Sequence, residues 1–135
     1  MRYIILVLFL TTFPAHADDL MPKVKYLSKE DVQAYFCSDP NCMEVVAFYD
    51  KPSRTIVLRD TFDPANEFDL SALIHEFVHH LQNINGEKRS RCRGDRERQA
   101  YEVQRTFLKE RGHKDTDKVM GIDMFTQFII TQCGE

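Results

Sequence analysis

The stretch Ser71–Gln82, SALIHEFVHHLQ, combines the apolar spacing of a buried helix with three histidines and a glutamate. Apolar residues recur at intervals of three and four, which predicts an amphipathic helix with one face in the core. They are Leu70, Leu73, Ile74, Phe77, Leu81 and Ile84. A core helix has little use for His75, Glu76 and His79 unless each polar group has a partner, because desolvation without one is costly. The segment therefore indicates a site built into a core helix.

The spacing of these polar residues predicts a metal site. Residues four apart on a helix lie on one face, so His75 and His79 can direct their imidazoles at one point, as two ligands of a zinc ion. Glu76 is displaced by about 100° around the helix, within reach of a water on the metal. This is the HExxH pattern, with Glu76 as general base and one zinc ion per chain. The alternative is that the histidines pair with Glu76 and the backbone without metal.

Two histidines and a water leave tetrahedral zinc one protein ligand short. The carboxylates that could supply it are Glu97 and Glu102, in the stretch DRERQAYEVQ of the next predicted helix. Their distances along the chain from His79 both permit a turn and an antiparallel approach of that helix. His80 falls on a different face from the ligand pair, so we expect it to be exposed or at the rim.

An HExxH helix followed by a short link and a glutamate on a second helix resembles the gluzincin metallopeptidases, the clan that includes thermolysin. The chain is also similar to small secreted domains with HExxH and a downstream ExxAY. The resemblance covers Ala72 to about Gln104. It implies zinc-dependent peptidase activity, in which the later glutamate is the third ligand. The stretch ERQAY from Glu97 matches ExxA, which favours Glu97 over Glu102 as that ligand.

One position departs from the larger gluzincins, which often carry an aspartate four residues after the ligand glutamate to orient a zinc histidine. Tyr101 stands at that position, so another group must orient the histidine. Tyr101 could donate to a ligand or to a tetrahedral oxyanion, or it could simply belong to the core. Arg111 and His113 are the other residues available as oxyanion donors.

The function predicted is zinc-dependent hydrolysis of peptide bonds in a peptide or protein substrate by metal-activated water. Glu76 takes a proton from the water and later passes it to the leaving amine. The small size and the lack of an identified oxyanion donor leave an alternative, an exported zinc-bearing binding or inhibitory module with lost or weak catalysis. A third reading is a metal-free structural domain that a partner recognises.

Residues 1–17, MRYIILVLFLTTFPAHA, have the layout of a secretory signal peptide. Arg2 precedes a short apolar run, and Ala15-His16-Ala17 forms a cleavage box. The run is too short for a permanent membrane anchor. The alternative is a buried N-terminal helix. We therefore predict export to a periplasm or the medium, with residues 18–135 forming a single zincin-like metallopeptidase domain.

The net charge and the cysteine content narrow the class of protein further. The formal net charge is −3, which gives no reason to expect nucleic-acid binding. The even cysteine count suggests two disulfides in an exported chain, and we favour Cys37–Cys42 and Cys92–Cys133. A structural zinc site made of these cysteines is the rival interpretation. The basic segment 88–98 is predicted to be solvated, and the alternative is a patch for an acidic partner.

The predicted fold class is α+β. Ser28 begins a short helix, and the β-rich segments Met43–Tyr49 and Thr55–Arg59 flank the turn KPSR as an antiparallel hairpin. We expect this small sheet to pack against the HExxH helix, a second zinc-ligand helix and a C-terminal helix. Asp69 is the predicted N-cap of the HExxH helix, which should end near Asn85-Gly86. The second helix should run from about Asp95 to Gly112.

The strand Thr55–Arg59 is also predicted to offer an edge to an extended peptide, which would bind by strand addition. The alternative is an ordinary hairpin strand that packs its Ile56 and Leu58 face.

Overall fold

The computed structural model describes residues 20–38 and 44–134. The predicted signal peptide, residues 1–17, lies outside the described residues, as does Cys42 of the predicted Cys37–Cys42 disulfide. The elements along the chain are β1 (Lys23–Leu27), α1 (Lys29–Phe36), β2 (Ala47–Asp50), β3 (Thr55–Arg59), α2 (Glu67–Ile84), α3 (Arg93–Glu110), α4 (Thr116–Met120) and α5 (Met124–Ile130). The α+β class is confirmed.

The sheet has three strands in the order β1-β3-β2, with β1 parallel and β2 antiparallel to β3. The predicted hairpin is confirmed, although β2 begins at Ala47 rather than Met43. The strand β1 was not predicted. Its apolar residues Val24 and Tyr26 are more than half exposed, so it joins the sheet through backbone pairing rather than through a buried face.

The prediction that Thr55–Arg59 offers a free edge is wrong. This segment is β3, the central strand, so its backbone groups pair with β1 and β2. The alternative is confirmed, because Ile56 and Leu58 are buried against Leu73 and Phe77 of α2. Within the described residues β2 is the strand that borders α2 and leaves its outer edge unpaired.

The helix α2 is longer at its start than predicted. Its N-cap is Asn66, whose side chain accepts hydrogen bonds from the backbone N–H groups of Phe68 and Asp69. Asp69 as N-cap is therefore wrong. Its carboxylate is buried, accepting from Arg59 Nη2 at 2.8 Å and from the backbone N–H of Asp63 at 2.9 Å. The far end agrees with prediction, with Asn85 as C-cap and Gly86 at φ +69°.

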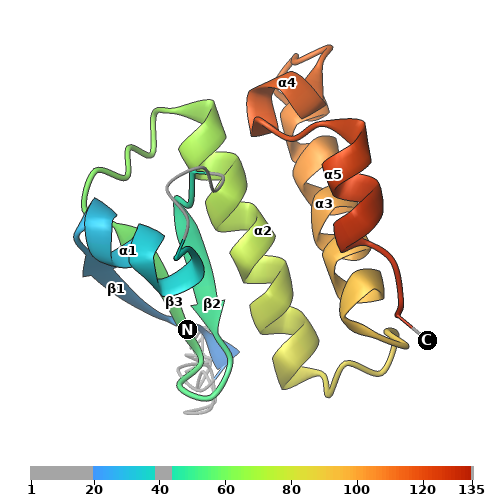
Figure 1. Cartoon of the computed structure of the whole chain (residues 1–135), viewed down its shortest axis with the longest axis horizontal. Helices are drawn as coiled ribbons and strands as arrows, with labels where there is room; N and C mark the ends of the chain where they lie inside the picture. Colours follow the sequence, from blue (N-terminus) through green and yellow to red (C-terminus); the bar gives the residue numbers. More distant parts are fainter. Residues whose placement is uncertain (1–19, 39–43, 135) are drawn as a thin grey trace, which may run out of the picture.

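Figure 1 shows α2 in the middle of the molecule, with the sheet and α1 on one side and α3 on the other. One apolar cluster lies between the sheet and α2, and another, around Leu108, Met120 and Ile122, joins α3 to the segment that contains α4 and α5. The helix α3 begins slightly before the predicted Asp95, and α5 fits the predicted C-terminal helix. The short helix α4 was not predicted. Within residues 20–38 and 44–134, no helix is long and apolar enough to cross a membrane.

Candidate metal centre

Three predicted ligands converge where α2 faces α3. His75 and His79 project from α2 and Glu97 from the second turn of α3, and one ligand atom of each lies within 4.8 Å of the others. The two Nε2 atoms are 3.1 Å apart, and they lie 3.2 and 3.4 Å from Glu97 Oε2. Glu102, the alternative ligand, is exposed and lies outside this cluster.

Two glutamines orient the imidazoles. Gln104 Oε1 lies 3.0 Å from His75 Nδ1, and Gln82 Oε1 lies 2.9 Å from His79 Nδ1. Each glutamine uses its amide NH₂ elsewhere, Gln104 toward Ser71 Oγ and Gln82 toward the Arg96 carbonyl. The amide oxygens can only accept, so each Nδ1 is the donor and each neutral imidazole keeps its lone pair on Nε2.

The sequence did not identify these two glutamines. It did require some other group to orient a histidine, because Tyr101 occupies the position where an orienting aspartate would stand. Gln82 lies three residues after His79, on a neighbouring part of the same helix surface, which is the signal that could have identified it. Gln104 is 4% exposed, and its amide faces α2 from α3. No spacing rule connects it to His75, which is distant in sequence.

The donor set fits a zinc ion. Two imidazole lone pairs and one carboxylate oxygen point at a common space, and only a proton or a cation between them makes that arrangement favourable. Ligands about 2.0–2.1 Å from tetrahedral zinc lie about 3.3 Å from one another. The observed separations of 3.1, 3.2 and 3.4 Å match this value. Three protein ligands would leave one position open, as in catalytic zinc sites.

The electrostatics of the cluster favour a cation. Burial would raise the pKa of Glu97, but hydrogen bonds from His75 and His79 outweigh it and hold that pKa far below its usual range. Burial would lower the pKa of His79, but its hydrogen bond to Glu97 and the charges of Glu76 and Glu97 raise it above the ordinary 6.5. Glu97 is thus an anion that attracts positive charge to the Nε2 atoms.

Glu76 lies beside the cluster, as predicted for a base rather than a ligand. Burial raises the pKa of its carboxyl, against the opposing charges of His75 and His79 and a backbone hydrogen bond from Tyr49 of β2. A raised pKa brings a carboxyl closer to the pH at which it exchanges protons efficiently. The hydrogen bond from Tyr49 shows that the Glu76 side chain extends from α2 toward the outer edge of the sheet.

Tyr101 borders the cluster, whereas the other two predicted oxyanion donors are remote from it. Its ring meets that of His75 edge to face, with centroids 4.5 Å apart. Burial and the charges of Glu97 and Glu76 raise the pKa of its phenol, so it stays a donor. Arg111 and His113 lie at the far end of α3, where they approach Glu67 at 2.7 and 3.7 Å.

His80 points away from the ligand pair, but the prediction that it is exposed or at the rim is wrong. It is fully buried. Its Nδ1 lies 3.1 Å from the Tyr49 hydroxyl, and its Nε2 lies 2.8 Å from the Leu20 carbonyl. His80 therefore ties α2 to the edge strand and to the start of the described chain.

Two cavities flank the cluster and share Val45, Ala47, His75, Glu76 and Tyr101. One, of about 370 Å³, extends toward α4 and the other, of about 620 Å³, toward the first turns of α3. Together they form a cleft with β2 on one wall and α3 on the other. The predicted base and one ligand lie at its centre.

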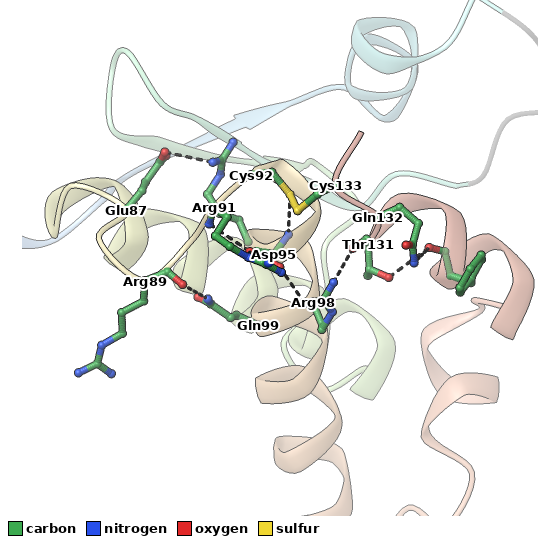
Figure 2. The surroundings of a disulfide bond; sticks show 12 residues. Glu87, Arg89, Arg91, Cys92, Asp95, Arg98, Gln99, Thr131, Gln132 and Cys133 are labelled. Atoms are coloured by element: carbon green, nitrogen blue, oxygen red, sulfur yellow. Dashed lines mark hydrogen bonds and ion pairs between the residues drawn. A yellow bond between two sulfur atoms is a disulfide. The ribbon is translucent and has the colours of Figure 1, made fainter. Parts of the chain in front are cut away.

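A second group of metal-ligating residue types lies nearby, namely Cys92, Asp95 and Cys133. Cys92 and Cys133 form the predicted disulfide, which closes a sequence separation of 41 residues. Figure 2 shows the C-terminal segment held against the start of α3 by this bond and by Arg98, which donates to the Thr131 carbonyl. The bonded sulfurs are not thiolates, so a cysteine zinc site using this pair is excluded.

Comparison with known proteins places the chain in a family. Residues 11–128 match DUF6647, a domain of unknown function. The chain belongs to the DUF6647 family. Comparisons with curated proteins and with solved structures find no match. The family description names no activity, so any function must be argued from the cluster and the cleft.

Proposed function

We propose that this DUF6647 chain is an exported zinc-dependent peptidase of the gluzincin type. The observation that carries the proposal is the convergence of His75 Nε2, His79 Nε2 and Glu97 Oε2 within 3.1–3.4 Å, with both imidazoles oriented by glutamine oxygens. The Cys92–Cys133 disulfide is compatible with an oxidising compartment outside the cytoplasm, and with the signal peptide predicted at residues 1–17.

In the proposed reaction, His75, His79 and Glu97 hold the ion. Zinc held there would supply Lewis acidity, which makes water nucleophilic near neutral pH and polarises a carbonyl. Glu76 takes a proton from the attacking water and passes it to the amine that leaves when the C–N bond breaks. In the same proposal Tyr101, whose ring contacts that of His75, donates a hydrogen bond to the negative oxygen that develops on the substrate carbonyl.

The edge of β2 offers the substrate a second set of contacts. The backbone N–H of Arg59 donates to the Val46 carbonyl, so alternate residues from Val46 face β3, and Ala47 and Tyr49 direct their backbone groups outward. Ala47 lines both cavities of the cleft. An extended peptide could therefore pair with Ala47 while its scissile bond lies near Glu76.

The decisive experiment compares Glu76→Gln with the wild type on an unselective peptide pool analysed by mass spectrometry. We expect the variant to keep one zinc per chain and to lose activity by about 10²–10⁴-fold, the usual contribution of a general base. Glu102→Gln, an exposed glutamate of α3, is the matched control and should retain activity.

Two outcomes would overturn the proposal. Full activity in Glu76→Gln would remove the base from the mechanism. A wild type that binds stoichiometric zinc and peptides without cleaving any of them would instead support the alternative of a zinc-bearing binding or inhibitory module.

A further inference from the structure

The cavity that extends toward the start of α3 has an unusual charge balance. Three of its lining residues are cationic, Lys51 after β2 and Arg93 and Arg96 on α3. Apart from the proposed base and the proposed ligand Glu97, the only carboxylate among its described lining residues is Glu87. The segment 88–98, predicted to be solvated, is therefore not uniform, because two of its arginines line the cleft.

Glu87 balances two of these three cations. Its carboxylate lies 2.7 Å from Lys51 Nζ and 3.2 Å from Arg96 Nη1, and the hydrogen bond from Lys51 lowers the pKa of Glu87. One anion is thus shared between two cations. The guanidinium of Arg96 is held in place by this contact at the wall of the cavity.

Arg93 has a different partner. Its Nε lies 3.8 Å from Glu97 Oε1, the only ion pair it makes among the described residues, and its side chain is 81% exposed. A bound metal ion would draw on the charge of Glu97, which weakens that carboxylate's hold on Arg93. In the metal-loaded protein Arg93 would then be a mobile cation beside the cleft without a full counter-charge.

The opposite cavity is chemically distinct. Its lining toward α4 is largely apolar and includes Val46, Phe68, Met120 and Ile122. A substrate that spans both cavities would meet apolar side chains on one side of the centre and positive charge on the other. The two ends therefore select for different groups.

From this asymmetry we infer that the cleft recognises a carboxylate of its peptide substrate at the Arg93 end, and this inference rests on the proposed peptidase function. The carboxylate belongs to an aspartate or glutamate side chain or to the peptide's C-terminus, since both present the same anion to a guanidinium. Arg93 and Arg96 are the specificity-determining residues, and Lys51 contributes positive charge behind them.

The test uses zinc-loaded full-length protein carrying Glu76→Gln and measures binding of fluorescein-labelled peptides by anisotropy, so that turnover is not required. Three peptides differ only in their anion: one has an internal glutamate and an amidated end, one has glutamine and an amidated end, and one has glutamine and a free carboxylate end. The same peptides without label serve for hydrolysis by the otherwise unmodified protein.

We expect tighter binding of one carboxylate peptide than of the neutral peptide, by about fivefold for each uncompensated cation at a partly exposed site. Arg93→Gln should reduce this preference, and Glu87→Gln, which releases Arg96 and Lys51, should increase it. Lys109→Gln, an equal charge change on exposed α3 surface, should leave it unchanged. Opposite effects of two single substitutions in one cavity cannot come from misfolding, which would weaken binding in both variants.

Equal binding of all three peptides, or a preference that Arg93→Gln does not alter, would overturn the inference. Hydrolysis separates this failure from failure of the proposed function. Cleavage without a carboxylate preference refutes only the specificity, whereas carboxylate-dependent binding without any cleavage supports the recognition and refutes the peptidase.

Discussion

Two clusters of metal-ligating residue types lie along the first two turns of α3, and they have opposite chemistry. In one, Cys92 and Cys133 have already bonded to each other beside Asp95. In the other, His75, His79 and Glu97 hold their donor atoms 3.1–3.4 Å apart with no covalent bond between them. Proximity of ligand-type residues is the same in both clusters, but only the second has donor atoms available to a metal.

The environment of Asp95 reinforces the contrast. Hydrogen bonds from the side chain and backbone of Arg91 lower the pKa of Asp95 to about 2, so its charge is already compensated. Glu97 has the exposed Arg93 at 3.8 Å and otherwise faces two imidazoles that are themselves oriented. The first cluster is a structural cross-link, whereas the second presents donor atoms of the types that ligate a cation.

The largest effect should come from Glu97→Ala. The variant removes one of three proposed ligands, so its zinc affinity should fall by more than the hundredfold typical of losing an orienting partner. Competition with a chelator followed by elemental analysis measures this loss. Glu102→Ala is the control and should keep one zinc per chain. Equal zinc binding by the two variants would show that Glu97 is not a ligand.

Removing the covalent cross-link should affect stability rather than metal binding. Cys92→Ser combined with Cys133→Ser should lower the free energy of unfolding by about 4 kcal/mol, from the loop entropy of a 41-residue separation. Denaturant titration without reductant measures this change. Zinc stoichiometry at saturating metal should stay at one per chain, and its loss would show that the disulfide also positions Glu97.

The orienting glutamines should have an intermediate effect. Gln104→Met keeps about the same side-chain volume but replaces the amide oxygen with a weakly accepting thioether, so His75 Nδ1 is poorly oriented and zinc affinity should fall about 10–100-fold. Gln132→Met, on the exposed C-terminal segment, is the control. An unchanged affinity in Gln104→Met would indicate that packing alone orients His75.

The smallest effect concerns pH. Because the raised pKa of His79 exceeds 6.5, its pairing with Glu97 stabilises the zinc-free fold below about pH 6.5, and this contribution is lost as pH rises through that pKa. Zinc binding displaces the proton, so affinity should increase with pH, by at most about tenfold per unit. Melting temperatures with zinc and with chelator should therefore diverge from about pH 5.5 to 8. A difference that does not change with pH would contradict the pairing of protonated His79 with Glu97 in the zinc-free protein.

Sequence alone predicted the local features well. The apolar periodicity and the His75–His79 spacing identified α2 and its polar face, because both follow from helix geometry over a few residues. The turn between β2 and β3 and the Cys92–Cys133 disulfide were likewise predicted and are confirmed. Local signals failed at Asp69, where a buried partner, Arg59, decides the role of the carboxylate.

The tertiary structure alone decided what depends on residues distant in the chain. Sheet order made β2 rather than β3 the free edge, since the exposed β1 occupies the other side of β3. The packing of α3 on α2 brought Glu97 and Gln104 to the histidines and left Glu102 exposed. The packing of the sheet on α2 buried His80 against Tyr49 of β2, although helix geometry had placed His80 correctly away from the ligand pair. A helix fixes the direction of a side chain, whereas only the element packed against that helix fixes what the side chain meets.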